Sequence, residues 1–525
     1  MREHTNPWVF GISGIAIIAF IILGVAFTDQ LGPITEGIRS GIGTNLGWLY
    51  MAATTFFLVA ALFLLFSRFG NIRLGPDDSR PEFSSLAWFA MLFTTGMGIG
   101  LVFFGVNEPV THLNAPRSEE LTPGEPEAVG EAFASTLFHW SFHPWAIYIA
   151  LGLSLGYFAF RKGLPLRPAS ALYPLLGDRA FGWIGNLVDI LAVFGTIFGL
   201  ATSLGLGTMQ INSGLNNVFG LPINGTSQTI IICVIIAVTL YSVMSGIDKG
   251  LRRLSVLNLG LAFVLMIFVF LVGPKLWMTS SMFTGAGDYL ANIVPWSLSF
   301  PSPLADDVAA TFAADWTLFY WGWWISWSPF VGIFLARISY GRKIREFVLG
   351  ALFAPAAISV LWFGVFGGAG TYYELFDDSF AGFSDDEAEA TYQLMDLLPL
   401  APAVATIAAL FLILVVTIFF ITSADSGSLV VDMLTNGGDT NPVRAQRAFW
   451  AVCVGGVTLI LLVLGGEDAL TALQAASVST GLPFAIVLVF MLIGLFLALS
   501  KERKPGEPKT VRAEDYRPTP RPDRR

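Results

Sequence analysis

Long apolar runs separated by short polar segments make up most of the chain. A helix needs about 20 residues to cross a hydrocarbon core about 30 Å thick, and windows of that length predict twelve spans. They cover residues 8–27, 48–66, 86–107, 132–160, 184–212, 227–245, 254–273, 314–337, 346–366, 400–422, 446–464 and 470–498. The first run is too long for a signal peptide and lacks a cleavage pattern, so we interpret it as a helix. The pattern predicts an all-α polytopic membrane protein.

The loops between the spans alternate in charge, with nearly all of the 29 basic residues on one side. The predicted inside carries Arg68, Arg73, Arg161, Lys162, Lys249, Arg252, Arg253, Arg342, Lys343, Arg345, Arg444 and the basic residues of the C-terminal tail. Only Arg39, Arg117 and Lys275 fall outside, where the loops are acidic. Because Lys and Arg are retained in cytoplasmic loops, we expect an inner (plasma) membrane protein with both termini in the cytoplasm.

The composition agrees with this interpretation, since 54% of residues are hydrophobic and only 13% are charged, about half the charge of a soluble domain. The two cysteines, Cys233 and Cys453, lie in apolar runs and offer neither a disulfide framework nor a metal-ligand pattern. We expect contact with membrane lipid, no cofactor and no nucleic-acid partner. The proline-rich, basic tail from Lys501 is predicted to be disordered, and either satisfies the charge rule or contacts anionic lipid.

The third span contains three glycines, Gly96, Gly98 and Gly100, at its centre. Glycine lets a helix unwind and expose carbonyl oxygens, which the hydrocarbon region tolerates only where they line a cavity or bind a cation. The same spacing also serves close packing between helices. Both interpretations stay open for this feature alone.

Aromatic residues lie near the middle of two other spans. The eighth span has four tryptophans followed by Pro329, and Trp324 and Trp327 are far from the interface where tryptophan usually lies.

The fourth span places Trp140, Trp145 and Tyr148 around Pro144. Such rings attract a cation that donates no ordinary hydrogen bond, each contact contributing up to about 2 kcal/mol. Core packing is the alternative, but two clusters at one depth favour an ammonium cage.

The tenth span carries Thr422, Ser423 and Asp425. Hydroxyl and carbonyl oxygens suit small hard cations, although the hydroxyls of Thr and Ser also bond to carbonyls of their own helix. Asp425 is expected near the cytoplasmic end with a structural role, because a charge costs about 3 kcal/mol at the bilayer centre.

Together these features favour a transporter with a LeuT-like core of two inverted five-helix repeats, each opening with a broken helix, and two extra N-terminal helices. The expected regions are the N-terminal helices (1–85), the first repeat (86–273), an extracellular connection (274–313), the second repeat (314–498) and the cytoplasmic tail (499–525).

Four stretches then resemble one known family: GMGIG at 96–100, FHWSFHPWAIY at 138–148, FYWGWWISWSPFVGIFLARIS at 319–339 and FFITSADS at 419–426. The chain from about residue 8 to 498 is similar to betaine–choline–carnitine transporters, most of all to the sodium-coupled glycine betaine members. The resemblance implies a sodium symporter that works by alternating access as a homotrimer.

Site residues follow from the same resemblance. It implies a substrate cage of Trp140, Trp145, Tyr148 and Trp324, with Trp327 as a further contact, Trp323 and Phe334 beside the pathway, and Met97, Gly98 and Gly100 at the substrate. It implies sodium ligands at Thr94, Met97, Phe419, Thr422 and Ser423, and a second sodium site that includes Thr196 and Phe330.

Position 200 departs from the family pattern, because Leu200 stands where the second sodium site has a threonine. The number of sodium ions is therefore open, with Thr202 or water as a substitute ligand. Gly100 replaces the carboxylate of proton-coupled relatives, which favours sodium, and the short proline-rich tail is not expected to sense osmolarity.

Other substrates and classes stay open. Choline, ectoine, carnitine and dimethylsulfoniopropionate also suit an aromatic cage, and a sodium-independent exchanger would share the fold. A membrane hydrolase built on Ser423, Asp425, His139 and His143 lacks a nucleophile elbow or a metal-binding spacing. A channel or a non-transporting receptor would share the topology, but neither needs both a cation-ligand set and a closed aromatic cage. We expect a transporter and not an enzyme.

Overall fold

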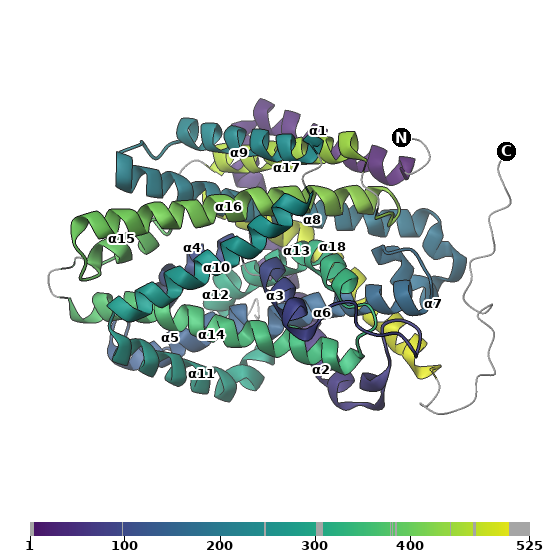
Figure 1. Cartoon of the computed structure of the whole chain (residues 1–525), viewed down its shortest axis with the longest axis horizontal. Coiled ribbons are helices and arrows are strands. Elements are labelled where there is room, and N and C mark those ends of the chain that lie inside the picture. Colours follow the sequence, from purple (N-terminus) through teal and green to yellow (C-terminus); the bar gives the residue numbers. More distant parts are fainter. Residues whose placement is uncertain are drawn as a thin grey trace.

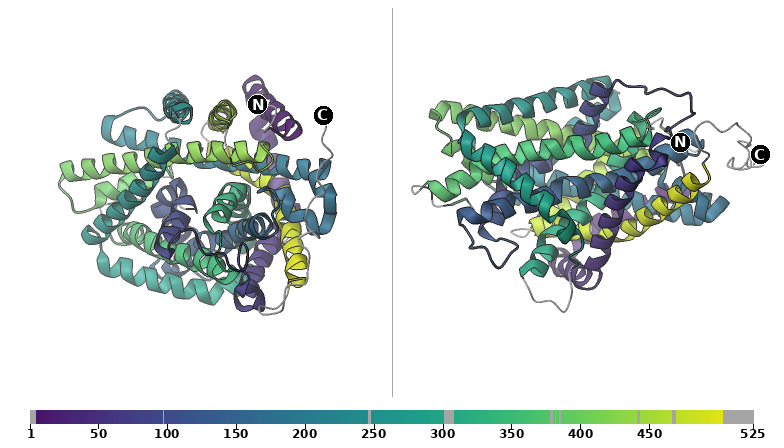
Figure 2. Two further views of the ribbon diagram at one scale, coloured as in Figure 1. Left: turned by 45° about the vertical axis from the view of Figure 1, so that its right-hand side comes forward. Right: turned by 90° about the horizontal axis from the view of Figure 1, so that it is seen from below.

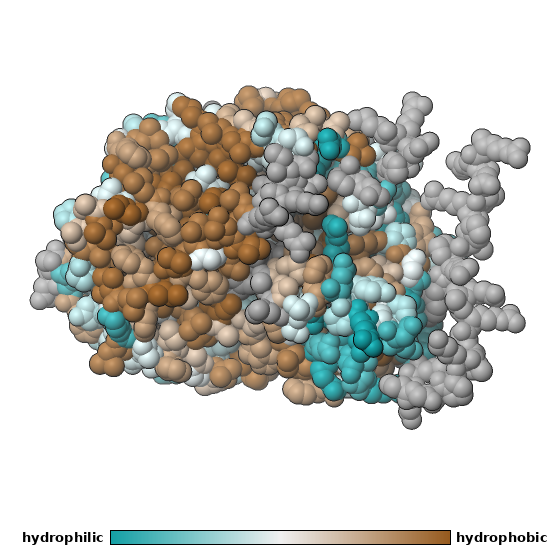
Figure 3. All heavy atoms as spheres, in the orientation of Figure 1, coloured by the Kyte–Doolittle hydropathy of each residue, from teal (hydrophilic) through white to brown (hydrophobic). Residues whose placement is uncertain are grey.

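The computed structural model describes residues 5–502 except 97, 246–247, 301–307, 378–379, 381, 384–385, 441–442 and 466–468. The described residues form helices and connecting loops, with one isolated β-bridge between Arg73 and Lys343. Many of the long helices run roughly along the long axis of the molecule (Figure 1). Hydrophobic residues cover most of the face shown in Figure 3, and hydrophilic residues gather toward one end. An apolar surface of this extent fits a lipid environment.

The helices are, in chain order, α1 Pro7–Ala26, α2 Thr28–Phe66, α3 Ser85–Gly96, α4 Ile99–Asn114, α5 Val129–Trp140, α6 Phe142–Gly156, α7 Tyr173–Leu176, α8 Trp183–Phe219, α9 Gly225–Ser245, α10 Asp248–Val272, α11 Lys275–Ser297, α12 Val308–Phe312, α13 Leu318–Ile338, α14 Ile344–Phe376, α15 Ala390–Leu397, α16 Pro402–Thr435, α17 Arg444–Gly465 and α18 Ala469–Ser500. A π-helical turn, Ala313–Thr317, leads into α13.

Among the described residues, nine helices are long and apolar enough to cross a membrane. The third predicted span is present as the pair α3 and α4, and the fourth as the pair α5 and α6. The all-helical prediction is confirmed. The number of twelve spans, the inverted repeat and the domain limits stay predictions.

The third span is interrupted at its glycines, as the sequence indicates. Helix α3 ends at Gly96 and α4 begins at Ile99, and Gly98 between them has non-helical angles, φ −142° and ψ −127°. Met97 lies outside the described residues.

The fourth span is interrupted at Ser141, three residues before the proline that the sequence indicated. Pro144 has no N–H to offer the carbonyl of Trp140 one turn earlier, and it is accommodated in the first turn of α6. That carbonyl instead accepts the Ser359 hydroxyl of α14 at 3.0 Å. The carbonyl of His139 accepts the indole N–H of Trp324 of α13 at 2.9 Å. The break is stabilised by its neighbours.

The predicted break in the eighth span is wrong, because α13 is continuous from Leu318 to Ile338 with Pro329 inside it. Proline leaves the carbonyl of Ile325, four residues earlier, without its helical donor. The Ser328 hydroxyl donates to this carbonyl at 2.7 Å. A local hydroxyl therefore supplies the missing hydrogen bond, and the helix continues.

The segment 274–313, expected as a connection, contains the helix α11. It packs against α5 and α14, and Gly285 allows a close approach, since a Cβ there would lie 2.3 Å from the Cβ of Phe133.

Loops predicted to lie inside meet at one end of the molecule. The amide of Leu74 donates to the carbonyl of Arg342 at 2.8 Å, and the amide of Asn6 donates to the carbonyl of Thr435 at 2.9 Å. Helix α15 lies at the opposite end from α7 (Figure 1).

Helix α13 packs against α6, α8 and α18 in the interior, and Figure 2 shows the surrounding helices from two further sides.

Candidate functional site

A cavity of about 800 Å³ brings the two predicted sets of site residues together. From those sets it is lined by Gly98, Gly100, Trp140, Trp324, Trp327, Phe330, Phe419, Thr422 and Ser423. Trp323 and Phe334, expected beside the pathway, line it too. The cavity extends to Glu82 and Thr440, which lie in the loops at the predicted inside. It therefore connects the tryptophans with that end.

The four rings of the expected cage form one continuous cluster. Trp140 and Trp324 meet edge to face with ring centres 5.0 Å apart. Tyr148 lies 6.4 Å from Trp324 and 5.5 Å from Trp145. Trp145 and Tyr148 are each only 1% exposed and do not line the cavity. The structure thus presents Trp140 and Trp324 to the cavity and places the other two rings behind them.

Stacking and hydrogen bonds fix the cavity tryptophans. Trp324 stacks on Trp323 with ring centres 4.4 Å apart and planes 16° apart. The Trp323 indole donates to the carbonyl of Gly199 at 3.3 Å. Gly199 allows this contact because a Cβ there would lie 2.9 Å from the backbone nitrogen of Trp327. These contacts hold Trp323 and Trp324 against each other and against the backbone of α8.

Gly100 has a specific packing reason in the structure. A Cβ at this position would lie 2.8 Å from ring carbons of both Trp140 and Trp323. Any side chain would displace the two rings. The glycine-rich interruption therefore serves the aromatic cluster directly as well as unwinding the helix.

The expected sodium ligands of α16 lie on the same cavity. The Thr422 hydroxyl donates within its helix, to the carbonyls of Ile418 at 2.8 Å and Phe419 at 3.2 Å. A hydroxyl that donates keeps lone pairs for a cation, so this bond is compatible with ion binding. Thr94 lies in α3, where its side chain is not described, and Met97 lies outside the described residues.

The second expected sodium site is not assembled in the same way. Thr196 is buried and its hydroxyl donates to the carbonyl of Ala192 at 2.7 Å. Leu200 fills the space beside Gly427 of α16, where a Cβ would lie 2.2 Å from a Leu200 methyl. Thr202, the alternative ligand, bonds toward α18, with its hydroxyl 2.8 Å from that of Ser477.

Asp425 forms a buried ion pair with Arg447 of α17, with an N to O distance of 2.5 Å. The two side chains line the cavity toward the predicted inside. This agrees with the structural role expected for Asp425.

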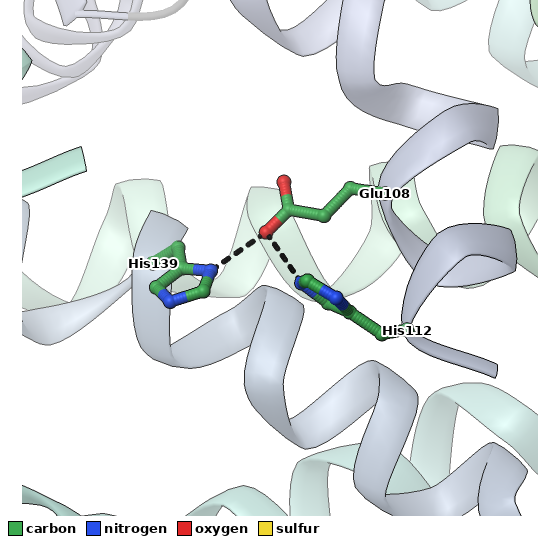
Figure 4. Close-up of side chains that lie close together, drawn as sticks. All are labelled: Glu108, His112 and His139. Carbon is green, nitrogen blue, oxygen red and sulfur yellow. Dashed lines mark hydrogen bonds and ion pairs between the residues drawn. The ribbon is translucent and has the colours of Figure 1, made fainter. Parts of the chain in front are cut away.

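A buried polar cluster lies next to Trp140 and was not predicted from the sequence. Glu108 of α4 is 0% exposed. Its Oε2 accepts the Trp140 indole N–H at 2.6 Å and the Tyr320 hydroxyl at 2.5 Å. Its Oε1 lies 2.8 Å from Nδ1 of His139 and 3.3 Å from Nε2 of His112 (Figure 4).

The same three side chains have the composition of a metal site. The ligand atoms of Glu108, His112 and His139 all lie within 4.8 Å of one another, and carboxylate and imidazole suit several transition metals. A carboxylate and a histidine four residues apart at the end of a span were the available signal. The predicted third span ends at residue 107 and therefore does not include this pair.

The hydrolase alternative gains no support from the geometry. His139 bonds to Glu108 and to the Thr317 hydroxyl at 3.0 Å, and His143 bonds to the Ser297 hydroxyl at 2.9 Å. Among the described residues, none of the hydrogen bonds found for these two histidines involves Ser423.

Comparison with known proteins identifies the family. The model of the betaine/carnitine/choline family transporters matches residues 8–504. The glycine betaine/proline/choline transporter of Vibrio parahaemolyticus is 41% identical over 511 residues, covering 94% of this chain and 90% of its own. The glycine betaine transporter OpuD of Bacillus subtilis is 41% identical over 506 residues, covering 96% of each. The glycine betaine transporter of Acinetobacter baylyi is 41% identical, covering 99% of this chain and 76% of its own.

These relatives are named as transporters and not as enzymes, and the apolar helices are those of a multi-pass membrane protein. The chain therefore belongs to the betaine/carnitine/choline transporter family.

Proposed function

We propose that this transporter imports glycine betaine together with sodium, by alternating access, across the plasma membrane. The observation that carries the proposal is a single cavity lined both by Trp140 and Trp324 and by Thr422 and Ser423. The aromatic faces suit a trimethylammonium group, and the oxygens suit a small hard cation.

Three further observations support the proposal. Relatives at 41% identity are named glycine betaine transporters. Of the residues that line the cavity, those in loops between spans all lie at the predicted inside. This opening corresponds to an inward-facing state of an alternating-access cycle. The basic loops gather at that same end, which supports cytoplasmic termini. A homotrimer is expected from the family resemblance alone.

The proposal includes one core sodium ion. Leu200 offers no oxygen, and the Thr202 hydroxyl bonds toward α18. We therefore expect uptake to depend on sodium with a Hill coefficient near one. Choline, carnitine, ectoine and dimethylsulfoniopropionate serve as competing substrates in the test.

Uptake of labelled glycine betaine into proteoliposomes tests the function. An imposed inward sodium gradient should drive accumulation, and a proton gradient without sodium should not. Counterflow without any ion dependence would instead identify an exchanger. Mass photometry of the purified protein tests the trimer.

The sodium site is tested in the same assay by Thr422→Ala combined with Ser423→Ala. Loss of two oxygen ligands should raise the sodium concentration for half-maximal uptake by about tenfold or more. Ser428→Ala is the matched control, since this buried hydroxyl bonds to the carbonyl of Asp425 at 2.7 Å and does not line the cavity. An unaltered sodium dependence in the double variant would refute the assignment.

A further inference from the structure

We propose that the buried carboxylate of Glu108 determines specificity for a cationic headgroup by acting through the indole of Trp140. This inference rests on the proposed function, because it needs a quaternary-ammonium substrate in the cavity beside Trp140. It assigns Glu108 a role in substrate recognition without direct contact.

The bond between Glu108 and Trp140 is the first step. An indole N–H only donates, so Glu108 Oε2 is the acceptor at 2.6 Å. A hydrogen bond to an ionised acceptor is shorter and stronger than a neutral one. It draws the indole hydrogen toward the carboxylate and leaves more negative charge on the ring. The face of Trp140 then attracts a cation more strongly.

The contacts of Glu108 suit its ionised form. Each carboxylate oxygen has two neighbouring groups that are able to donate: Trp140 and Tyr320 at Oε2, His139 and His112 at Oε1. An ionised carboxylate only accepts and has room for all four bonds. The side chain is fully buried, so its charge is poorly screened by solvent and acts over the short distance to the cavity.

The same carboxylate also orients the second cavity ring. The Trp324 indole donates to the backbone carbonyl of His139. The side chain of His139 is in turn hydrogen-bonded to Glu108. Tyr320 donates to Glu108 and stacks on Trp324 with ring centres 5.9 Å apart. Glu108 is therefore bonded to elements that hold both Trp140 and Trp324.

A bound transition metal is the competing explanation for the cluster. The 2.8 Å separation of Glu108 Oε1 and His139 Nδ1 is that of a direct hydrogen bond. Metal-bound histidines normally have a partner on the second ring nitrogen, but Nδ1 of His112 has none among the described residues. Direct hydrogen bonding fits these two facts better.

The test compares two ligands of one shape. Glycine betaine and tert-butylacetate differ in that carbon replaces the ammonium nitrogen, so only the first is cationic at that end. Their affinities for the purified full-length protein are measured by calorimetry in the presence of sodium. For Glu108→Gln, the ratio of the two affinities should fall about tenfold, equivalent to about 1.4 kcal/mol.

Two further variants separate charge from packing. Glu108→Asp keeps the charge but withdraws it from the indole, so its ratio should fall between the wild-type and Gln values. Ser359→Ala removes a neutral hydrogen bond to the carbonyl of Trp140. It should change both affinities alike and leave the ratio as in the wild type.

The outcomes are distinct. A wild-type protein that does not bind glycine betaine overturns the proposed function and this inference with it. A wild-type protein that binds it, with an unchanged ratio in Glu108→Gln, overturns the inference alone. If that variant does not fold, an unchanged ratio in Glu108→Asp has the same meaning. A ratio that requires added Zn²⁺ and is lost with a chelator overturns the inference in favour of a metal site.

Discussion

At the scale of single residues, the proposed substrate cage consists of rings that are also part of the packed interior. Trp324 is only 4% exposed, contacts Trp323 and Trp140, and bonds to the carbonyl of His139. Its replacement therefore affects binding and stability together, and a control must separate the two effects.

We expect Trp324→Leu to weaken glycine betaine binding by about 30-fold or more, because a desolvated cation–π contact contributes about 2 kcal/mol. Calorimetry on the folded variant measures this loss. Trp450→Leu removes an equally buried tryptophan that bonds to Thr435 and does not line the cavity. It should lower the thermal unfolding temperature but leave the affinity unchanged. An unchanged affinity in Trp324→Leu would disprove the cage.

At the scale of helices, α13 is continuous where a proline predicted a break. The composition does not predict this continuity. The donor to the free carbonyl is the hydroxyl of Ser328, which precedes Pro329 and bonds to Ile325 in the preceding turn. The break of the fourth span, by contrast, is held by Ser359 and Trp324 from other helices.

A double-mutant cycle tests the continuity of α13. Ser328→Ala should destabilise the protein by about 1–2 kcal/mol, because it leaves the buried carbonyl of Ile325 without a donor. In the background Pro329→Ala, a restored N–H bonds to this carbonyl, and Ser328→Ala should then cost much less. Unfolding in detergent measures the four proteins. Strictly additive effects would contradict the proposed compensation.

At the scale of the whole molecule, Glu502 just after α18 binds the π-helical turn Tyr157–Arg161 that follows α6. The Glu502 carboxylate accepts from Arg161 at 2.9 Å, Lys162 at 2.8 Å and Tyr157 at 2.7 Å. Burial alone would raise the pKa of Glu502, but these hydrogen bonds outweigh it and lower the pKa to about 2.

Glu502→Gln should therefore lower stability at neutral pH by about 1 kcal/mol, because the pair is partly exposed. A folded-state pKa below the usual 4.5 stabilises the protein above that pH. The difference between wild type and variant should be lost as the pH falls from about 4.5 to about 2. Thermal unfolding across this range measures it. Lys501→Gln, which changes a neighbouring charge, should show no such pH dependence, and a constant difference for Glu502→Gln would rule out the linkage.

The sequence by itself determined the class of this protein. Apolar run lengths, alternating loop charge, central glycines and central tryptophans are local patterns, and they predicted an all-helical membrane transporter. They did so because a bilayer requires about 20 apolar residues per span and a backbone whose polar groups are satisfied inside the protein. The individual site residues were implied by the family resemblance and stay predictions. Helix α11 was not predicted, because its polar residues interrupt the apolar run.

Only the tertiary structure decided which groups meet. Trp140 and Trp324, far apart in sequence, share one cavity with Thr422, while Leu200 fills the space beside Gly427. The proposed role of Glu108 in recognition depends on its contacts with His139, Trp140 and Tyr320, which only the structure shows. The physical reason is that a buried carboxylate must find its donors among neighbouring helices, and no periodicity along a single helix records those neighbours.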